Sequence, residues 1–300
     1  MQLDQLVTEA INERTRNLDE LSTLELVSTI NAEDKQVALA VEKALPQIAA
    51  ATDLIAGALR RGNRVFYVGA GTSGRLGVLD ASELPPTFGV SPDLFVGIIA
   101  GGHGALVKSS EGLEDVKEEA RKDLAVAGLR SGDVVVALAA SGRTPYAIAA
   151  LEMALEIGAH AVAVTCNPDS EMARVAEVTI AAVVGPEPVS GSTRMKAGTA
   201  QKMILNMLST GAMVKSGKVY GNLMVDVRPT NLKLEERARR IIMRATGVEY
   251  PVASRALLDS GNDVKTSVVM CLCRVDAAAA QRALQQTGGF VRKAVALLQR

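Results

Sequence analysis

Short apolar runs and longer amphipathic stretches alternate along the first two thirds of the chain. Five short runs are rich in Val, Ile, Leu and Ala without strict apolar–polar alternation: 65–68, 94–100, 134–139, 161–165 and 178–184. Such runs are typical of strands buried on both faces of a parallel sheet. Helical periodicity occupies the stretches around them: 36–59, 73–84, 110–127, 146–157, 171–176 and 201–215. The pattern predicts an α/β fold with a five-stranded parallel sheet covered on both faces.

The pattern changes after Asn231. A charged helix opening at 235–240 is followed by short helical patterns that are interrupted by glycines. Residues 219–227, with Gly221-Asn222 in the middle, are a candidate hairpin. We therefore predict two domains, residues 1–234 with the sheet and 235–300 as a small domain of three or four helices.

Three loops rich in Gly, Ser and Thr follow the first, third and fifth predicted strands, at 69–75, 139–145 and 185–202. Hydroxyls and backbone N–H groups between a strand and a helix start are typical of phosphate sites. Because the carboxyl ends of parallel strands meet at one edge of a sheet, we expect the loops to converge on a phosphorylated ligand. The candidate ligand-binding residues are Thr72, Ser73, Ser141, Arg143, Thr144, Ser190, Ser192, Thr193 and Arg194.

Each loop by itself also allows a simpler interpretation. Residues 69–75 match G-x-G-x-x-G loosely, and the next strand ends in Gly101-Gly102 instead of the acid that a dinucleotide site requires. In the simpler interpretation, Ser73 serves as a helix cap and Arg143 is a surface charge. The combination of three such loops favours the phosphate site over three independent caps.

Composition narrows the class of partner. The 300 residues carry 33 acidic and 33 basic side chains, no Trp and 3% aromatic residues, which argues against nucleic-acid binding. No apolar run approaches the roughly 20 residues that cross a membrane. The sparse cysteines, Cys166, Cys271 and Cys273, indicate reduced thiols in a cytoplasmic protein. No second Cys or His pair accompanies Cys271 and Cys273, so we expect core packing and no metal site.

Longer stretches carry a family resemblance. These are GAGTSGRLGVLDASELPPTFG (69–89), AGGHGALVKSSEGLEDV (100–116), AASGRTPYAIAALE (139–152), GPEPVSGSTRMKAGTAQK (185–202) and KSGKVYGNLMVDVRPTNLKL (215–234). The three loops resemble the sugar isomerase (SIS) domain, which binds phosphosugars. Residues 185–202 resemble the signature shared by glucokinase regulatory protein and the N-acetylmuramic acid 6-phosphate etherases. The resemblance to the etherases covers essentially the whole chain, and it implies an SIS-type three-layer sandwich followed by a UBA-like helical domain.

The resemblance implies a lyase that uses no cofactor. Its substrate would be N-acetylmuramic acid 6-phosphate, a cell-wall amino sugar, and its products N-acetylglucosamine 6-phosphate and D-lactate. In the open-chain sugar the C2 proton is acidified by the C1 aldehyde, and the lactyl ether oxygen at C3 needs a proton before it leaves. Two carboxyl groups in different environments can divide these tasks.

The resemblance assigns these tasks to Glu83, as the acid, and to Glu114, as the base at C2. From the residues alone, each reads as a solvated acid at or on a helix. Glu111 lies three residues before Glu114 on the predicted helix, so it stays an alternative base. His103 follows the second strand and is left outside the catalytic set.

Two rival classes are weighed against the lyase. Aldose–ketose isomerases commonly pair a carboxylate with a ring-opening His, for which His103 is the one candidate. Glucokinase regulatory protein resembles two such domains in tandem, whereas this chain has room for one, and residues 1–35 hold few cations for a basic DNA-binding segment. We expect a homodimer that pairs through the apolar-rich helices 36–59 and 200–214.

Overall fold

The computed structural model describes residues 7–108, 112–227 and 231–299. The chain forms two compact units. The first comprises residues 1–82 and 93–209, and the second comprises residues 83–92 and 210–300.

The first unit is built on one parallel sheet, as predicted. Its strands run in the order β2-β1-β3-β4-β5, and every neighbouring pair is parallel. Their bounds are β1 (Val65–Gly69), β2 (Phe95–Ile99), β3 (Val134–Leu138), β4 (His160–Thr165) and β5 (Val178–Ala181). All five residues of β1 and of β3 are buried, which explains why the central strands read as continuous apolar runs.

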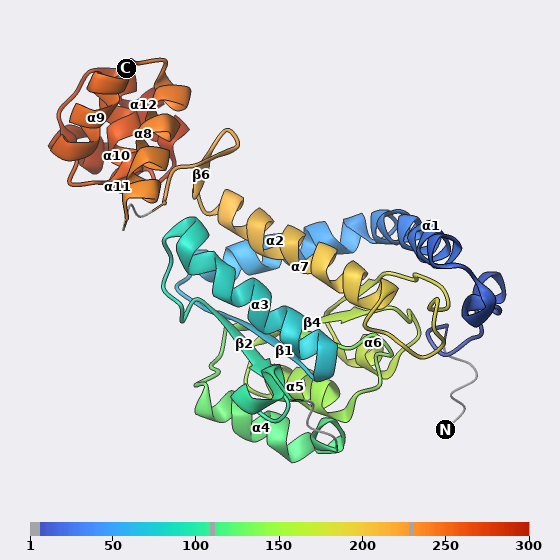
Figure 1. The fold of residues 1–300 in the computed structure, drawn as a ribbon. Coiled ribbons are helices and arrows are strands. Elements are labelled where there is room, and N and C mark those ends of the chain that lie inside the picture. Colours follow the sequence, from blue (N-terminus) through green and yellow to red (C-terminus); the bar gives the residue numbers. More distant parts are fainter. Residues whose placement is uncertain (1–6, 109–111, 228–230, 300) are drawn as a thin grey trace. The chain divides into compact units, whose positions relative to one another are not determined.

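Helices cover both faces of the sheet (Figure 1). One face packs against α4 (Lys117–Val126), α5 (Pro145–Glu156) and α6 (Glu171–Val175), in a core that includes Phe66, Val68 and Leu151. The other face, which carries Tyr67, packs against α2 (Leu45–Arg60) and the first-unit parts of α3 (Gly71–Phe88) and α7 (Lys196–Lys215). The predicted three-layer arrangement is therefore confirmed.

The predicted single helix over 36–59 is wrong. The structure has two helices there, α1 (Thr23–Glu42) and α2, separated by Lys43 and Ala44. Pro46 lies in the first turn of α2. Its ring would clash with the carbonyl of Glu42 in a continuous helix, whereas the first turn of a new helix tolerates the missing N–H.

Two further helix boundaries differ from the predictions. Helix α3 does not end before Pro85-Pro86 but continues to Phe88, because Leu84 and Phe88 are buried on one face of its last turns. The helix predicted over 110–127 begins only at Lys117. A 3₁₀ turn, η5 (Leu113–Asp115), precedes it, and extended Val116 (φ −98°, ψ 103°) separates the two. Residues 110 and 111 lie outside the described residues.

Short 3₁₀ turns complete the first unit. They are η2 (Glu13–Thr15), η3 (Leu18–Glu20) and η4 (His103–Leu106). His103 is exposed in η4 and follows the end of β2, as expected from the sequence.

The second unit contains a hairpin and a helical bundle. The predicted hairpin is confirmed as β6 (Val219–Tyr220) paired with β7 (Leu223–Met224). Among residues 231–299 five helices form instead of three or four: α8 (Leu232–Thr246), α9 (Tyr250–Asp259), α10 (Val264–Cys273), α11 (Ala277–Gln286) and α12 (Val291–Leu298). Ile242, Leu257 and Val268 belong to their shared core. The division into domains at residues 234 and 235 stays a prediction.

Within the three described ranges, no helix is both long and apolar enough to span a membrane.

Candidate functional site

The turn after β1 (residues 69–75) brings two hydroxyls to the edge of the sheet. Thr72 and Ser73 are half-buried in the first turn of α3, where backbone N–H groups have no acceptor within the helix. A Cβ on Gly74 would lie 2.6 Å from the carbonyl oxygen of Gly69 and 2.7 Å from Ile99 Cγ1. Glycine is therefore required for the helix to start directly against the strand end.

The loop after β3 (residues 139–144, the β3 loop) is fixed by neutral groups. The carbonyl of Ala140 accepts hydrogen bonds from Cys166 N (3.0 Å) and Asn167 Nδ2 (2.9 Å), just after β4. Gly142 has a φ of +68°, and a Cβ there would collide with the side chain of Ser170. Ser141, Arg143 and Thr144 are half-buried, and α5 begins immediately afterwards at Pro145.

The loop after β5 (residues 182–195, the β5 loop) is fixed by a buried carboxylate. Glu187 is fully buried and accepts the backbone N–H groups of Lys196 (2.8 Å) and Ala197 (2.9 Å), so it caps α7. Burial raises the pKa of Glu187 above its ordinary value, against the effect of these two donors. Because both N–H groups bond to Glu187, they are not open to a ligand.

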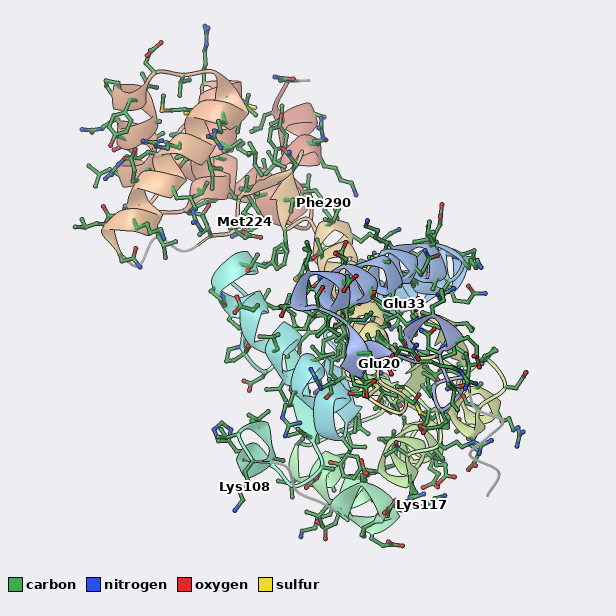
Figure 2. All side chains as sticks on the ribbon, turned by 45° about the vertical axis from the view of Figure 1, so that its right-hand side comes forward. Glu20, Glu33, Lys108, Lys117, Met224 and Phe290 are labelled. Atoms are coloured by element: carbon green, nitrogen blue, oxygen red, sulfur yellow. The ribbon has the colours of Figure 1, made fainter. Side chains whose placement is uncertain are left out.

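Two cations of the 185–202 stretch are committed to carboxylates. Glu33 of α1, which is labelled in Figure 2, pairs with the fully buried Lys196 at 2.7 Å. The Arg14 hydrogen bond is the foremost cause that lowers the pKa of Glu33 to about 2, with Lys196 and Asn12 adding to it. Lys202 pairs with Asp80 of α3 at 2.6 Å. Arg194 is exposed, and its contact with a ligand stays a prediction.

The segment from Val7 to Arg16 ties the β5 loop to the rest of the edge. Asn12 Nδ2 donates to the carbonyl of Pro186 (3.2 Å), and Thr15 Oγ1 donates to that of Pro188 (2.8 Å). Val7 N donates to Asn167 Oδ1 (3.1 Å), the side chain that also binds the β3 loop. The sequence alone did not indicate this role.

The turn after β1 and the start of α7 lie side by side. Ser73 Oγ donates to Gln201 Oε1 (2.9 Å), and a Cβ on Gly198 would lie 3.4 Å from Thr72 Cγ2. Thr193 accepts the N–H of Gly198 through its carbonyl (3.0 Å), while Ser190 is exposed and Ser192 half-buried. The β3 loop leaves the strand next to β1 at the same edge. The three loops thus share one edge of the sheet, while their ligand roles remain predictions.

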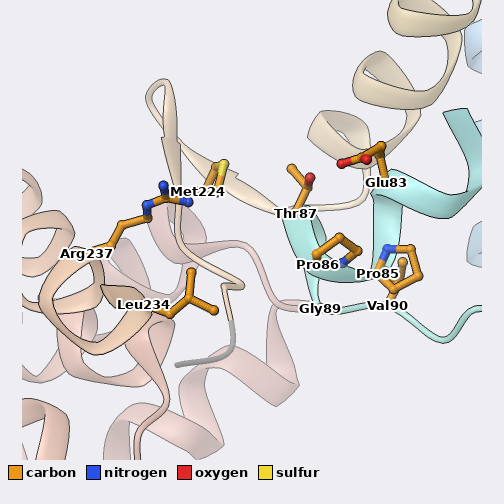
Figure 3. A pocket seen from close by; sticks show the side chains of 9 residues that line it. All are labelled: Glu83, Pro85, Pro86, Thr87, Gly89, Val90, Met224, Leu234 and Arg237. Atoms are coloured by element: carbon orange, nitrogen blue, oxygen red, sulfur yellow. The ribbon is translucent and has the colours of Figure 1, made fainter. Parts of the chain in front are cut away.

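The two candidate catalytic carboxylates occupy different units. Glu114 is exposed in η5 of the first unit, and not on a helix face as predicted. Glu111 lies outside the described residues. Glu83 is exposed on α3, in the second unit. There it lines a pocket of about 420 Å³ together with Met224, Leu234 and Arg237 (Figure 3).

Comparison with protein families defines the class. The SIS domain model matches residues 109–211, and the model of the glucokinase regulatory protein N-terminal SIS domain matches residues 47–155. Together these matches run from α2 through every strand of the sheet into α7. The chain is an SIS-domain protein, as the sequence predicted.

Curated relatives define the family. The chain is 56% identical to an N-acetylmuramic acid 6-phosphate etherase of Clostridium botulinum, over 98% of this chain and 97% of the relative. It is 59% identical to one of Symbiobacterium thermophilum, over 92% of this chain and 91% of the relative. The chain belongs to the N-acetylmuramic acid 6-phosphate etherase family, and it is an enzyme. A solved phosphoheptose isomerase of Neisseria gonorrhoeae is also similar, with 19% identity and a TM-score of 0.49, covering 63% of this chain and 98% of that one.

Proposed function

We propose that this enzyme is a carbon–oxygen lyase that removes D-lactate from N-acetylmuramic acid 6-phosphate and yields N-acetylglucosamine 6-phosphate. The observation that carries the proposal is 56–59% identity to curated etherases over nearly the whole chain. The hydroxyl-bearing loops at one edge of the sheet agree with a phosphorylated substrate.

Neutral donors hold the phosphate in this proposal. Lys196 and Lys202, the two lysines of the 185–202 stretch, are paired with Glu33 and Asp80. Ser73, Ser141 and Ser192 or Thr193 then supply hydroxyls, and the first turn of α3 supplies N–H groups and the positive end of its dipole. Arg143 and Arg194 add the cationic contacts.

Two carboxyl groups carry the chemistry. Glu114 takes the C2 proton of the open-chain sugar, and the electron pair of the broken C2–H bond is first held as the enolate of the C1 aldehyde. That pair then forms the C2–C3 double bond as the C3–O bond breaks. Glu83 gives its proton to the departing lactate oxygen. Water then adds at C3 as Glu83 takes up its proton, and C2 is reprotonated. The sum is one water consumed and one lactate released, with no change in oxidation state and no cofactor required.

The test separates the two proton transfers. Glu114→Gln is expected to abolish both lactate release and exchange of the C2 proton with solvent deuterium. Glu83→Gln is expected to stop lactate release and to leave C2 exchange in place. Each loss in turnover should reach about 10²–10⁴-fold. Glu118→Gln, which changes an exposed acid of α4, is the matched control and should leave both readouts unchanged.

Three other results would reject parts of this proposal. Rapid C2 exchange in Glu114→Gln would reject that base and make Glu111 the next residue to test. Formation of a ketose would identify an isomerase. Binding without turnover would identify a phosphosugar-responsive regulator.

We further propose that a cytoplasmic homodimer is the working unit, with the helical segment 235–300 as a separate domain of each copy. Glu83 follows Ser73 by ten residues on α3, which corresponds to about 15 Å along the helix axis. That length is greater than the span from the phosphate to C3 of one hexose, so within one copy the two side chains would have to bridge the remainder. A second copy that supplies Glu83 would complete the site.

Mixing inactive variants tests the shared site. If two copies share each site, Glu83→Gln and Glu114→Gln subunits re-form one intact site per mixed dimer, and part of the activity returns. Continued inactivity of the mixed dimer would reject a shared site. A sedimentation run that shows an active monomer at assay concentration would reject the dimer itself.

A further inference from the structure

A buried amide faces the turn after β1 with one of its two ends unpaired. Gln201 of α7 is 1% exposed, and its Oε1 accepts the proton of Ser73 Oγ at 2.9 Å. Its Nε2 has no hydrogen-bond partner among the described residues. An unpaired buried N–H group destabilises a folded protein, because it has lost its water partners without gaining another. A polar group held at that cost beside a ligand loop points to a function.

In this arrangement Ser73 cannot donate a hydrogen bond to an anion, because its hydroxyl already donates to Gln201 Oε1. A serine hydroxyl has one proton and can accept two hydrogen bonds. While that proton bonds to Gln201 Oε1, Ser73 offers only lone pairs to other partners. A phosphate oxygen needs a donor, so the proton must be redirected when a phosphorylated ligand binds.

A half-turn of the amide achieves this without repacking. The two ends of a carboxamide have nearly the same shape, so their exchange leaves the surrounding core unchanged. Gln201 Nε2 then donates to Ser73 Oγ, and the Ser73 proton is free for the phosphate. The neighbouring Lys202–Asp80 ion pair joins α7 to α3 and keeps the two side chains in register.

We propose that Gln201 is a positioning residue for phosphate binding, which acts by orienting the hydroxyl of Ser73. The proposal rests on the function proposed above, since it takes a sugar 6-phosphate as the ligand. In this proposal Gln201, a neutral side chain that does not itself contact the ligand, makes the turn after β1 selective for an anion.

The experiment is a double-mutant cycle on the full-length enzyme, with N-acetylglucosamine 6-phosphate as the calorimetric probe. The variants are Ser73→Ala, Gln201→Met, their combination, and Gln201→Glu. Gln201→Met removes both polar ends at nearly constant shape and should weaken binding about three- to tenfold, the worth of one neutral hydrogen bond. In the Ser73→Ala background, Gln201→Met should cause no further loss, because its effect passes through Ser73.

Gln201→Glu tests the orientation of the Ser73 hydroxyl more directly. An ionised carboxylate can only accept, so it holds the Ser73 proton and adds negative charge beside the phosphate site. It should weaken binding more than Gln201→Met does. The thermal midpoint of Gln201→Met should equal or exceed that of the wild type, because the unpaired buried donor is gone. Ser209→Ala changes another buried polar side chain of α7 and should leave affinity unchanged.

The outcomes separate a failure of the role proposed for Gln201 from a failure of the proposed phosphate site or activity. Equal losses from Gln201→Met in the wild-type and Ser73→Ala backgrounds would overturn the inference and leave the phosphate site standing. A loss of stability that accompanies an unchanged affinity would also overturn it. Wild-type affinity in Ser73→Ala would reject this turn as the phosphate site, while lactate release by the wild-type enzyme tests the proposed activity independently.

Discussion

The β3 loop and the β5 loop present hydroxyls at the same edge of the sheet, but they are held in different ways. The β3 loop is fixed by neutral hydrogen bonds to the Ala140 carbonyl and by a glycine that lets Ser170 approach. The β5 loop is fixed by buried charges, with Glu187 on the start of α7 and Lys196 on Glu33.

This difference has an energetic meaning. Neutral hydrogen bonds contribute about 0.5–1.5 kcal/mol each, so the loss of one is tolerated. A buried ion pair adds little net stability, but removal of one partner leaves an uncompensated charge in the interior. The β5 loop should therefore be the more sensitive of the two to single substitutions in the residues that support it.

The largest expected effect comes from Glu33→Gln. It leaves the fully buried Lys196 ammonium without its carboxylate, so the free energy of unfolding should fall by about 3–5 kcal/mol. Urea unfolding of wild type and variant measures the difference. The matched control is Glu156→Gln, which breaks the exposed Arg121–Glu156 pair and should have a much smaller effect. Similar losses in both variants would contradict the comparison.

The same stability difference should depend on pH. The pKa of Glu33 is lowered to about 2 from an ordinary value of 4.5, so its contribution is fully present above the ordinary value. It is lost as the pH falls toward about 2, where the folded protein also takes up the proton. Unfolding curves of wild type and Glu33→Gln should therefore converge between these values. Glu187 is common to both proteins, so its raised pKa cancels in the difference.

The β3 loop should respond to the shape of one residue. Gly142→Ala places a Cβ against Ser170 at a φ of +68°, and it should lower the free energy of unfolding by about 1–3 kcal/mol. Thermal unfolding provides the measurement. The control is Gly104→Ala, where a Cβ meets nothing within 4 Å and φ is not positive. An unchanged midpoint in Gly142→Ala would mean that the loop adjusts freely.

The smallest expected effects concern single hydroxyls. Ser141→Ala and Ser192→Ala should each weaken binding of a sugar 6-phosphate by about three- to tenfold, without a large change in stability. Combined, they should weaken it by about 10–100-fold in calorimetry. Ser131→Ala, before β3, removes a hydroxyl at the other edge of the sheet and serves as the control. Unchanged affinity in the double variant would place the phosphate site elsewhere.

The sequence predicted the sheet because buried parallel strands leave a strong local signal. Short apolar runs such as 134–139 correspond to strands within a few residues. Boundaries that depend on tertiary burial were missed. Leu84 and Phe88 carry α3 past two prolines, and no local pattern around them announces the surface that buries them.

The candidate site likewise has parts that the sequence predicts from a local pattern and parts that depend on tertiary contacts. The hydroxyl loops were predicted because glycines and hydroxyls after a strand are a local pattern. The support from Glu33, Asn12 and Gln201 was not, since these side chains meet partners that lie 128 to 174 residues away in sequence. A single sequence contains no signal for such pairings. Glu187 is different, because it lies only a few residues before the helix that it caps, so its role leaves a local pattern.

The segment from Val7 to Arg16 has a consequence for how the protein is made. Its partners Asn167, Pro186 and Pro188 follow it by roughly 160 to 174 residues. During synthesis at about 5–20 residues per second, this segment waits many seconds for the backbone that it will bind. Contacts of such sequence separation also form late, because a long loop must close first. This segment leaves the ribosome well before its partners and is thus among the last to be fixed in place.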